Sequence, residues 1–157
     1  MASFRIVTVI AAPIRVCFDL ARDIDFHTRS MTHTGERAVA GRTSGLIGLG
    51  ESVTWEARHL GVRQRLTSRI TAFDRPTHFR DEMTAGAFRS FAHDHQFEER
   101  DGGTVMTNEV AFRSPFGPLG WLVDSLFMTG YLRRLLTGRC RAIKQEAEAV
   151  GGRPAES

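Results

Sequence analysis

Two histidines, His93 and His95, stand two positions apart in a segment that has the pattern of a β-strand. Successive side chains of a strand point to opposite faces, so residues two apart share a face. Phe91 and Phe97 have the same parity and mark the apolar face of residues 87–99 by their size. Both imidazoles are therefore expected on the buried side of a sheet, where they could bind a ligand or transfer a proton.

Two further polar residues, Asp81 and Asn108, follow the same rule on two other predicted strands. Alternation places Asp81 on the apolar face of residues 78–85 and Asn108 on that of residues 104–113. The large apolar side chains that mark these two faces are Phe79, Met83, Met106, Val110 and Phe112. If the strands are neighbours, the four polar side chains form one patch in an otherwise apolar chamber.

Three interpretations of this patch stay open. It could be a hydrogen-bonded network that satisfies itself inside the core. It could be a recognition patch, in which histidine and asparagine orient a carbonyl or hydroxyl group of a mostly apolar ligand. It could also be catalytic, because a histidine beside a carboxylate can act as a general acid or base near neutral pH. The candidate catalytic residues are then His93, His95 and Asp81.

A metal ion and a nucleotide cofactor are both predicted to be absent. His93 and His95 could ligate one ion with Asp81 as a third ligand, but the zinc sites of enzymes usually need three well-placed protein ligands. The glycine-rich residues 45–50 lie between two predicted strands and lack the helix start that phosphate binding requires. They suit either a flexible connection or an apolar lip at the mouth of a cavity.

The elements that must position these residues follow one another along the chain. Residues 4–11 alternate like a strand, Pro13 begins a helix, and a second short helix reaches about residue 31. Residues 35–114 then predict a series of strands, with turns at Gly61, at 74–76 and at 101–103. These strands are expected at about 36–40, 51–60, 62–73, 78–85, 87–99 and 104–113.

After Pro118, apolar residues recur at three- and four-residue spacing and predict a helix of roughly 30 residues, about 45 Å long. Gly130 or Gly138 is expected to mark a kink or a close approach. The helix should bury its apolar stripe on the concave face of the sheet. That stripe consists of Leu119, Leu122, Val123, Leu126, Phe127, Tyr131, Leu135, Leu136, Cys140, Ile143 and Ala147. The outer side is predicted to be basic, with Arg133, Arg134, Arg139, Arg141 and Lys144.

The order of strand, two short helices, six strands and a long helix resembles the START-like (SRPBCC) superfamily over residues 4–148. The resemblance rests on residues 12–18, 79–82, 97–104 and 114–120, taken in their order and spacing. It implies an α+β helix-grip fold, in which a curved antiparallel sheet of about seven strands wraps around the long C-terminal helix. It further implies a deep cavity for lipids, steroids, hormones or polyketides. Some members are cyclases or dehydratases.

Bulk properties bound the remaining possibilities. The chain of 157 residues suits one domain over residues 1–150, with a disordered tail at 151–157. The net charge of +3 is too small to predict a nucleic-acid partner. Neither a membrane-spanning segment nor a signal peptide is expected, so a cytoplasmic location is predicted, with Cys17 and Cys140 as free thiols. The basic outer side of the long helix leaves membrane contact as a minor alternative, and a monomer or a homodimer fits equally.

The leading hypothesis is therefore a protein that binds a hydrophobic small molecule without a cofactor. The alternatives are a polyketide cyclase or dehydratase that uses His93 or His95 as general acid or base, and a module that binds another protein. The apolar residues expected to line or close the chamber are Trp55, Leu66, Phe79, Met83, Phe91, Phe97, Met106, Phe112 and Phe127. Those expected to orient the ligand are Asp81, His93, His95 and Asn108.

Overall fold

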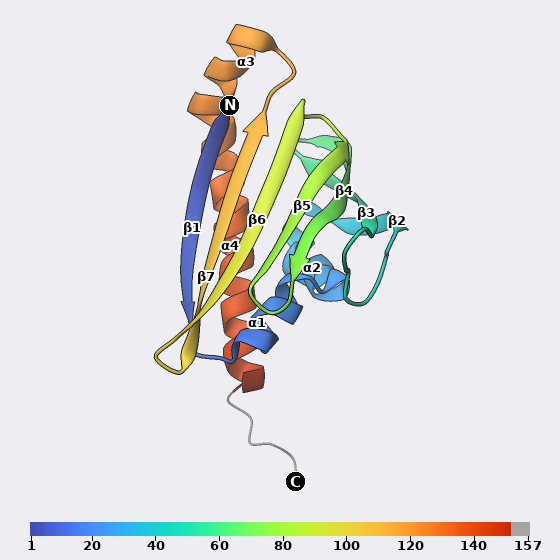
Figure 1. Ribbon diagram of the computed structural model, residues 1–157. Helices are drawn as coiled ribbons and strands as arrows, with labels where there is room; N and C mark the ends of the chain where they lie inside the picture. The colour runs from blue at the N-terminus through green and yellow to red at the C-terminus, as the bar shows by residue number, and fades with distance from the viewer. Residues whose placement is uncertain (152–157) are drawn as a thin grey trace.

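The computed structural model describes residues 1–151, except for the side chain of Asp124. Its strands form one antiparallel sheet in the order β1-β7-β6-β5-β4-β3-β2 (Figure 1). The strands are β1 (Ala2–Ile10), β2 (Arg37–Gly41), β3 (Ser52–His59), β4 (Val62–Asp74), β5 (His78–Ala85), β6 (Ser90–Arg100) and β7 (Gly103–Arg113). The predicted antiparallel sheet of about seven strands is confirmed. Strands β2 to β6 each pair with the next strand along the chain, and β1 pairs with β7.

Two short helices follow β1, as predicted. Pro13 precedes α1 (Ile14–Ala21), and the Asp23 carboxylate accepts a hydrogen bond from the Phe26 backbone N–H at 3.1 Å, which caps α2 (Ile24–Ser30). A single 3₁₀ turn (Thr32–Thr34) leads into β2. These helices cover one end of the inner face of the sheet, behind β4 and β5 in Figure 1.

The C-terminal segment is helical throughout, from Gly117 to Gly151. It consists of α3 (Gly117–Val123), a π-helical turn (Asp124–Met128) and α4 (Thr129–Gly151). The disordered tail was predicted to begin at residue 151, but Gly151 is the last residue of α4. Residues 152–157 lie outside the described residues. In Figure 1, α4 lies along the inner face of the sheet, and α3 projects beyond the ends of β1 and β7. The helix-grip architecture is thus confirmed.

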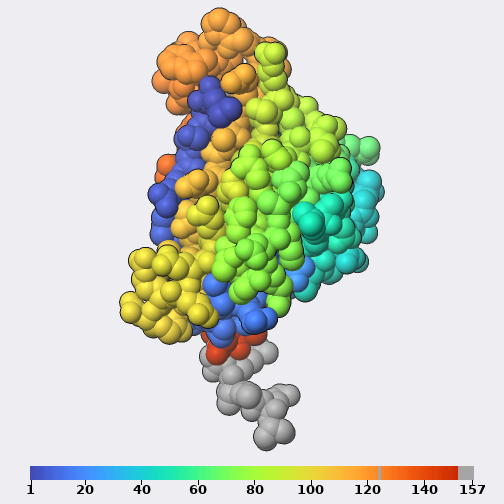
Figure 2. Space-filling model, in the orientation of Figure 1, coloured from blue at the N-terminus to red at the C-terminus, as the bar shows by residue number. Residues whose placement is uncertain are grey.

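The core lies between the sheet and the helices. Phe18 of α1 is fully buried, and its ring packs edge-on against Phe73, Phe79 and Phe97, with centroids 5.3–5.5 Å apart. Cys17 is buried beside it and, like Cys140, is a free thiol. Figure 2 shows the molecule from the outer face of the sheet, and the sheet covers most of α4 in this view. No helix within residues 1–151 is long and apolar enough to cross a membrane.

Candidate functional site

A cavity of about 170 Å³ lies between the inner face of the sheet and the helices α2 and α4. A second chamber of about 150 Å³ continues it toward the beginning of α4 and the β3–β4 turn. Both chambers are lined by Glu36, Trp55, His59, Leu66, Phe91 and Leu132, so the two chambers adjoin each other. The rest of the apolar wall of the first chamber is Ala21, Ile24, Met31, Ile47, Val53, Ile70, Phe79, Leu135 and Leu136.

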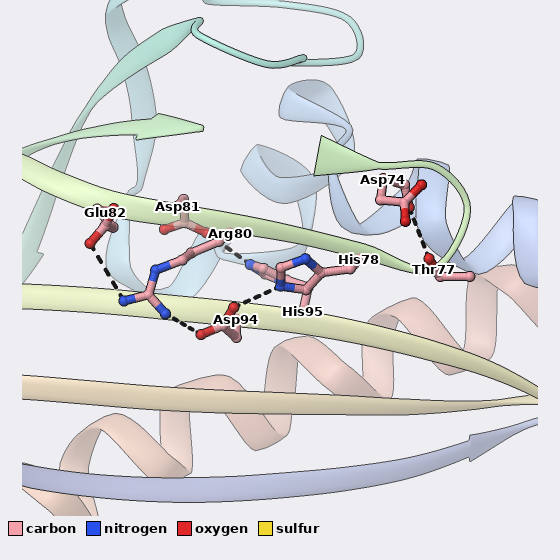
Figure 3. Close-up of polar contacts among 8 residues, drawn as sticks. All are labelled: Asp74, Thr77, His78, Arg80, Asp81, Glu82, Asp94 and His95. Carbon is pink, nitrogen blue, oxygen red and sulfur yellow. Dashed lines mark hydrogen bonds and ion pairs between the residues drawn. The ribbon is translucent and has the colours of Figure 1, made fainter. Parts of the chain in front are cut away.

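Of the predicted polar patch, Asp81, His93 and His95 line the cavity on β5 and β6, and Asn108 of β7 lies behind them. His95 Nε2 lies 2.8 Å from Asp81 Oδ2 (Figure 3), and His93 Nε2 lies 2.8 Å from Asn108 Oδ1. The two imidazole rings stack with their centroids 3.8 Å apart. Strand pairing sets this arrangement, because Asp81 is opposite His93 and Asn108 is opposite His95. Both bonds therefore run diagonally between neighbouring strands.

Burial controls the charge of this patch. The removal of water, followed by the proximity of His95, lowers the pKa of His93 to about 3. Burial likewise holds the pKa of His95 well below its ordinary value, and it raises the pKa of Asp81. Near neutral pH both imidazoles are therefore uncharged. They can donate or accept a hydrogen bond, and their lowered pKa values make both rings weaker proton acceptors than an ordinary histidine.

A second polar group, which sequence reasoning missed, lies on the opposite side of the cavity. His27 of α2 lies 2.6 Å from the Glu36 carboxylate through Nε2, and its ring stacks on Trp55 with the centroids 4.1 Å apart. His59 Nδ1 lies 2.7 Å from the Tyr131 hydroxyl. Burial lowers the pKa of His27. Burial by itself raises the pKa of Glu36, but the contact with His27 together with the charge of Arg139 leaves that pKa below its ordinary value.

The prediction that Arg139 belongs to the basic outer side of the long helix is wrong. The structure buries it, and it lines the cavity. One guanidinium nitrogen, Nη2, donates to the backbone oxygen of Ala21 at 2.8 Å. Spacing could have revealed this position, because Arg139 lies four residues after Leu135 and four before Ile143, on the same side of the helix. Its charge led to the wrong assignment.

The structure divides the predicted binding residues into two sets. Those that line the cavity are Trp55, Leu66, Phe79, Asp81, Phe91, His93 and His95. Phe97 and Met106 are buried in the core beneath α1, and Phe112 is buried in a separate cluster with Phe4 and Val110. Asn108 does not line the cavity: its Oδ1 lies against His93, and its Nδ2 donates to Cys140 Sγ at 3.4 Å. Met83 packs over Gly86 at the end of β5.

Phe127 requires a correction, since it was expected to close the chamber. It is 52% exposed and lies in the π-helical turn. A π-helical turn inserts an additional residue, so side chains before it no longer share the face of α4 that meets the sheet. The other exposed apolar residues of this region are Phe116, Leu119, Trp121, Leu122, Val123 and Leu126. The inner-face stripe therefore begins at Met128 and Leu132 rather than at Leu119.

One group within the described residues has the geometry to hold a metal ion. The candidate ligand atoms of Asp81, His93 and His95 lie within 4.8 Å of one another. The Nε2 atoms of both histidines already have hydrogen-bond partners, and Arg139 lowers the pKa of both by its positive charge. A bound cation would meet the same repulsion. The absence of a metal stays a prediction.

Comparisons with known proteins agree with this architecture. Residues 1–148 match the family model described as "Polyketide cyclase / dehydrase and lipid transport". No curated protein matches the sequence. The crystal structure of protein TTHA0849 from Thermus thermophilus is similar, with 19% identity, coverage of 90% of this chain and 97% of the other, and a TM-score of 0.70.

Two other solved structures share the fold at similarly low identity. Protein Ms6760 from Mycobacterium smegmatis is 19% identical, with coverage of 94% and 92% and a TM-score of 0.69. Major latex-like protein 151 from Panax ginseng is 15% identical, with coverage of 93% and 97% and a TM-score of 0.64. At these identities the solved structures show the fold alone, whereas the family model spans nearly the whole sequence. The chain therefore belongs to the polyketide cyclase / dehydrase and lipid transport family of START-like proteins.

Proposed function

We propose that the protein binds a hydrophobic small molecule with one or two polar groups in the cavity between the sheet and α4. The observation that carries this proposal is the cavity itself: an open space of about 170 Å³ with mostly apolar walls and a few converging buried polar groups. The second chamber extends the space for the apolar part of the ligand. Family membership supports the same class of function.

A polar network that only stabilises the core would not require this space. His93 and Asn108 satisfy each other, as do His95 and Asp81, and such pairs pack without a void in most protein interiors. The apolar walls beside them offer water few hydrogen-bond partners. A cavity with that composition is suited to an apolar ligand whose polar end reaches the histidines.

Replacing Leu66 with tryptophan tests the proposal, because Leu66 lines both chambers. We expect the larger ring to occupy space in the chambers that Leu66 lines and to weaken the binding of the neutral fluorescent probe N-phenyl-1-naphthylamine about tenfold or more, since overlap with the ligand is unfavourable. The measurement is a fluorescence titration. Val9→Trp, at a position 67% exposed on β1, is the matched control and should bind like the wild type. Equal binding by Leu66→Trp, or no binding by the wild type, would contradict the proposal.

A second candidate is a cyclase or dehydratase, and the buried Asp81–His95 pair favours it. A neutral His95 could remove a proton from the carbon next to a ketone, through the ring nitrogen that does not face Asp81. Asp81 would hold the ring in position and stabilise the imidazolium that forms. The resulting enolate would attack a second carbonyl of the same chain, and the alkoxide that forms would take the proton back from His95. Loss of water from this alcohol, followed by enolisation of the remaining ketone, would complete an aromatic ring.

The outer face of the same two strands supplies a matched control for that candidate. His78 Nε2 lies 2.7 Å from Asp94 Oδ1, so β5 and β6 carry the same kind of pair on the side away from the cavity (Figure 3). With a linear poly-β-ketone as substrate, His95→Gln should lower the cyclisation rate about 100-fold or more, the usual contribution of acid–base catalysis. His78→Gln should leave it unchanged. Equal rates in both variants would exclude His95 as the base.

A further inference from the structure

We propose that the ligand of this cavity is a carboxylic acid and that its carboxylate binds the buried guanidinium of Arg139. This inference rests on the proposed binding function and narrows it to one ligand class. It follows from the hydrogen bonding of Arg139, from the charges near it and from the position of the two adjoining chambers.

Arg139 is 8% exposed, and it lines the first chamber. Nη2 donates to the backbone oxygen of Ala21, whereas Nε is buried without a hydrogen-bond partner among residues 1–151. Buried polar atoms almost always have partners, so the unpaired Nε shows that the hydrogen bonding of this cavity-lining residue is incomplete within residues 1–151. The guanidinium presents its donors in a planar fork that matches both oxygens of a carboxylate.

The acidic side chains of the cavity do not satisfy this charge directly. Glu36 lies against His27 Nε2, and Asp81 lies against His95 Nε2. Neither carboxylate forms an ion pair with Arg139 within the described part of the chain, although each acts on it at longer range. A cation removed from water without a direct counter-ion is unfavourable, and an anionic ligand group beside it removes much of that penalty.

The shape of the space orients the rest of the ligand. Arg139 lines the first chamber only, and its neighbours there include the apolar side chains of Ile24, Leu135 and Leu136. The second chamber, lined by Leu60, Phe88 and Met128 among others, lies toward the beginning of α4. An acid with its carboxylate at Arg139 would therefore extend its apolar body past the histidines into the second chamber.

The test compares ligands that differ only at the head group. Decanoic acid, methyl decanoate and decanol displace N-phenyl-1-naphthylamine from the wild type at about pH 7.5, where a carboxyl group is ionised. We expect the acid to bind at least about tenfold more tightly than the alcohol, the effect of one charge-assisted hydrogen bond. Arg139→Met should weaken the acid about tenfold and change decanol less than about threefold. Arg134→Met, at an exposed arginine of the same helix, is the control and should keep the preference.

The outcomes separate this inference from the proposed function. If the wild type binds the acid and the alcohol equally, Arg139 does not recognise a carboxylate, and the cavity function stands. If folded Arg139→Met keeps the full preference for the acid, the inference is also overturned. If neither the probe nor any of the three ligands binds, both proposals fail. Should Arg139→Met not fold, the wild-type comparison still decides, and Arg139→Lys, which keeps the charge, should retain part of the preference.

Discussion

Replacing Phe18 with alanine is expected to lower the free energy of unfolding by about 3–5 kcal/mol, the usual cost of removing a buried aromatic ring. The ring is fully buried and is the contact through which α1 meets Phe73, Phe79 and Phe97 on β4, β5 and β6. Neighbouring rings fixed by strand backbones cannot collapse fully into the vacated volume. The remaining cavity adds to the loss of buried apolar area.

Urea titration followed by circular dichroism measures this change. Phe116→Ala is the matched control, because Phe116 is 68% exposed and its loss should change stability by less than about 0.5 kcal/mol. The substitution should also reach the site, since Phe79 stacks on His95 with the ring centroids 4.0 Å apart. A loss below about 1 kcal/mol for Phe18→Ala, against the usual range for a buried ring, would show that α1 is not held by this cluster.

Strand periodicity predicted the polar patch correctly because the alternation of side chains along a strand is a local rule with few exceptions. Once residues 78–85, 87–99 and 104–113 are strands, the parity of Asp81, His93 and Asn108 is decided by their numbers alone. Their contacts needed only that the strands pair in sequence order, which hairpin turns enforce. The confirmed fold rests on the same kind of local signal, repeated along the chain.

The residues that sequence reasoning missed lie where segments distant in sequence meet. His27 and Glu36 contact each other across the turn between α2 and β2, which no periodic pattern describes. Arg139 was misplaced because a charged residue on a helix is usually solvated, although its spacing from Leu135 favoured the inner face. Phe127 was misplaced because a π-helical turn interrupts the periodicity, and such turns have no simple sequence signal.

Acidification from about pH 7.5 to about pH 5 is expected to destabilise the protein by several kcal/mol. The pKa values of His27, His59, His93 and His95 all lie below the ordinary histidine value in the folded protein, chiefly because burial disfavours the charged ring. In the unfolded chain these groups titrate near 6.5. Below that pH the unfolded state binds more protons than the folded state, so stability falls as the pH falls.

His93 gives the size of one contribution. Its folded pKa of about 3 keeps the ring neutral throughout the range, whereas the unfolded ring is protonated below about 6.5. At pH 5 this difference costs about 2 kcal/mol. The groups that face His93 are His95, Asp81, Asn108 and Arg139. The raised pKa of Asp81 acts in the opposite direction, because a protonated carboxyl favours the folded state at low pH, and it offsets part of the loss.

The contribution of His93 to the pH dependence of stability can be isolated by urea titration. The midpoints are measured at several pH values for the wild type and for His93→Gln. Glutamine can still donate to Asn108 but cannot titrate, so the stability of His93→Gln should fall about 2 kcal/mol less than that of the wild type between about pH 7.5 and pH 5. Val9→Ala, at the exposed position on β1, changes no titratable group and should follow the wild-type profile. Parallel profiles for wild type and His93→Gln would refute the assignment. Because the prediction concerns the difference in slope, a general loss of packing in the variant would shift its whole profile and could not imitate the result.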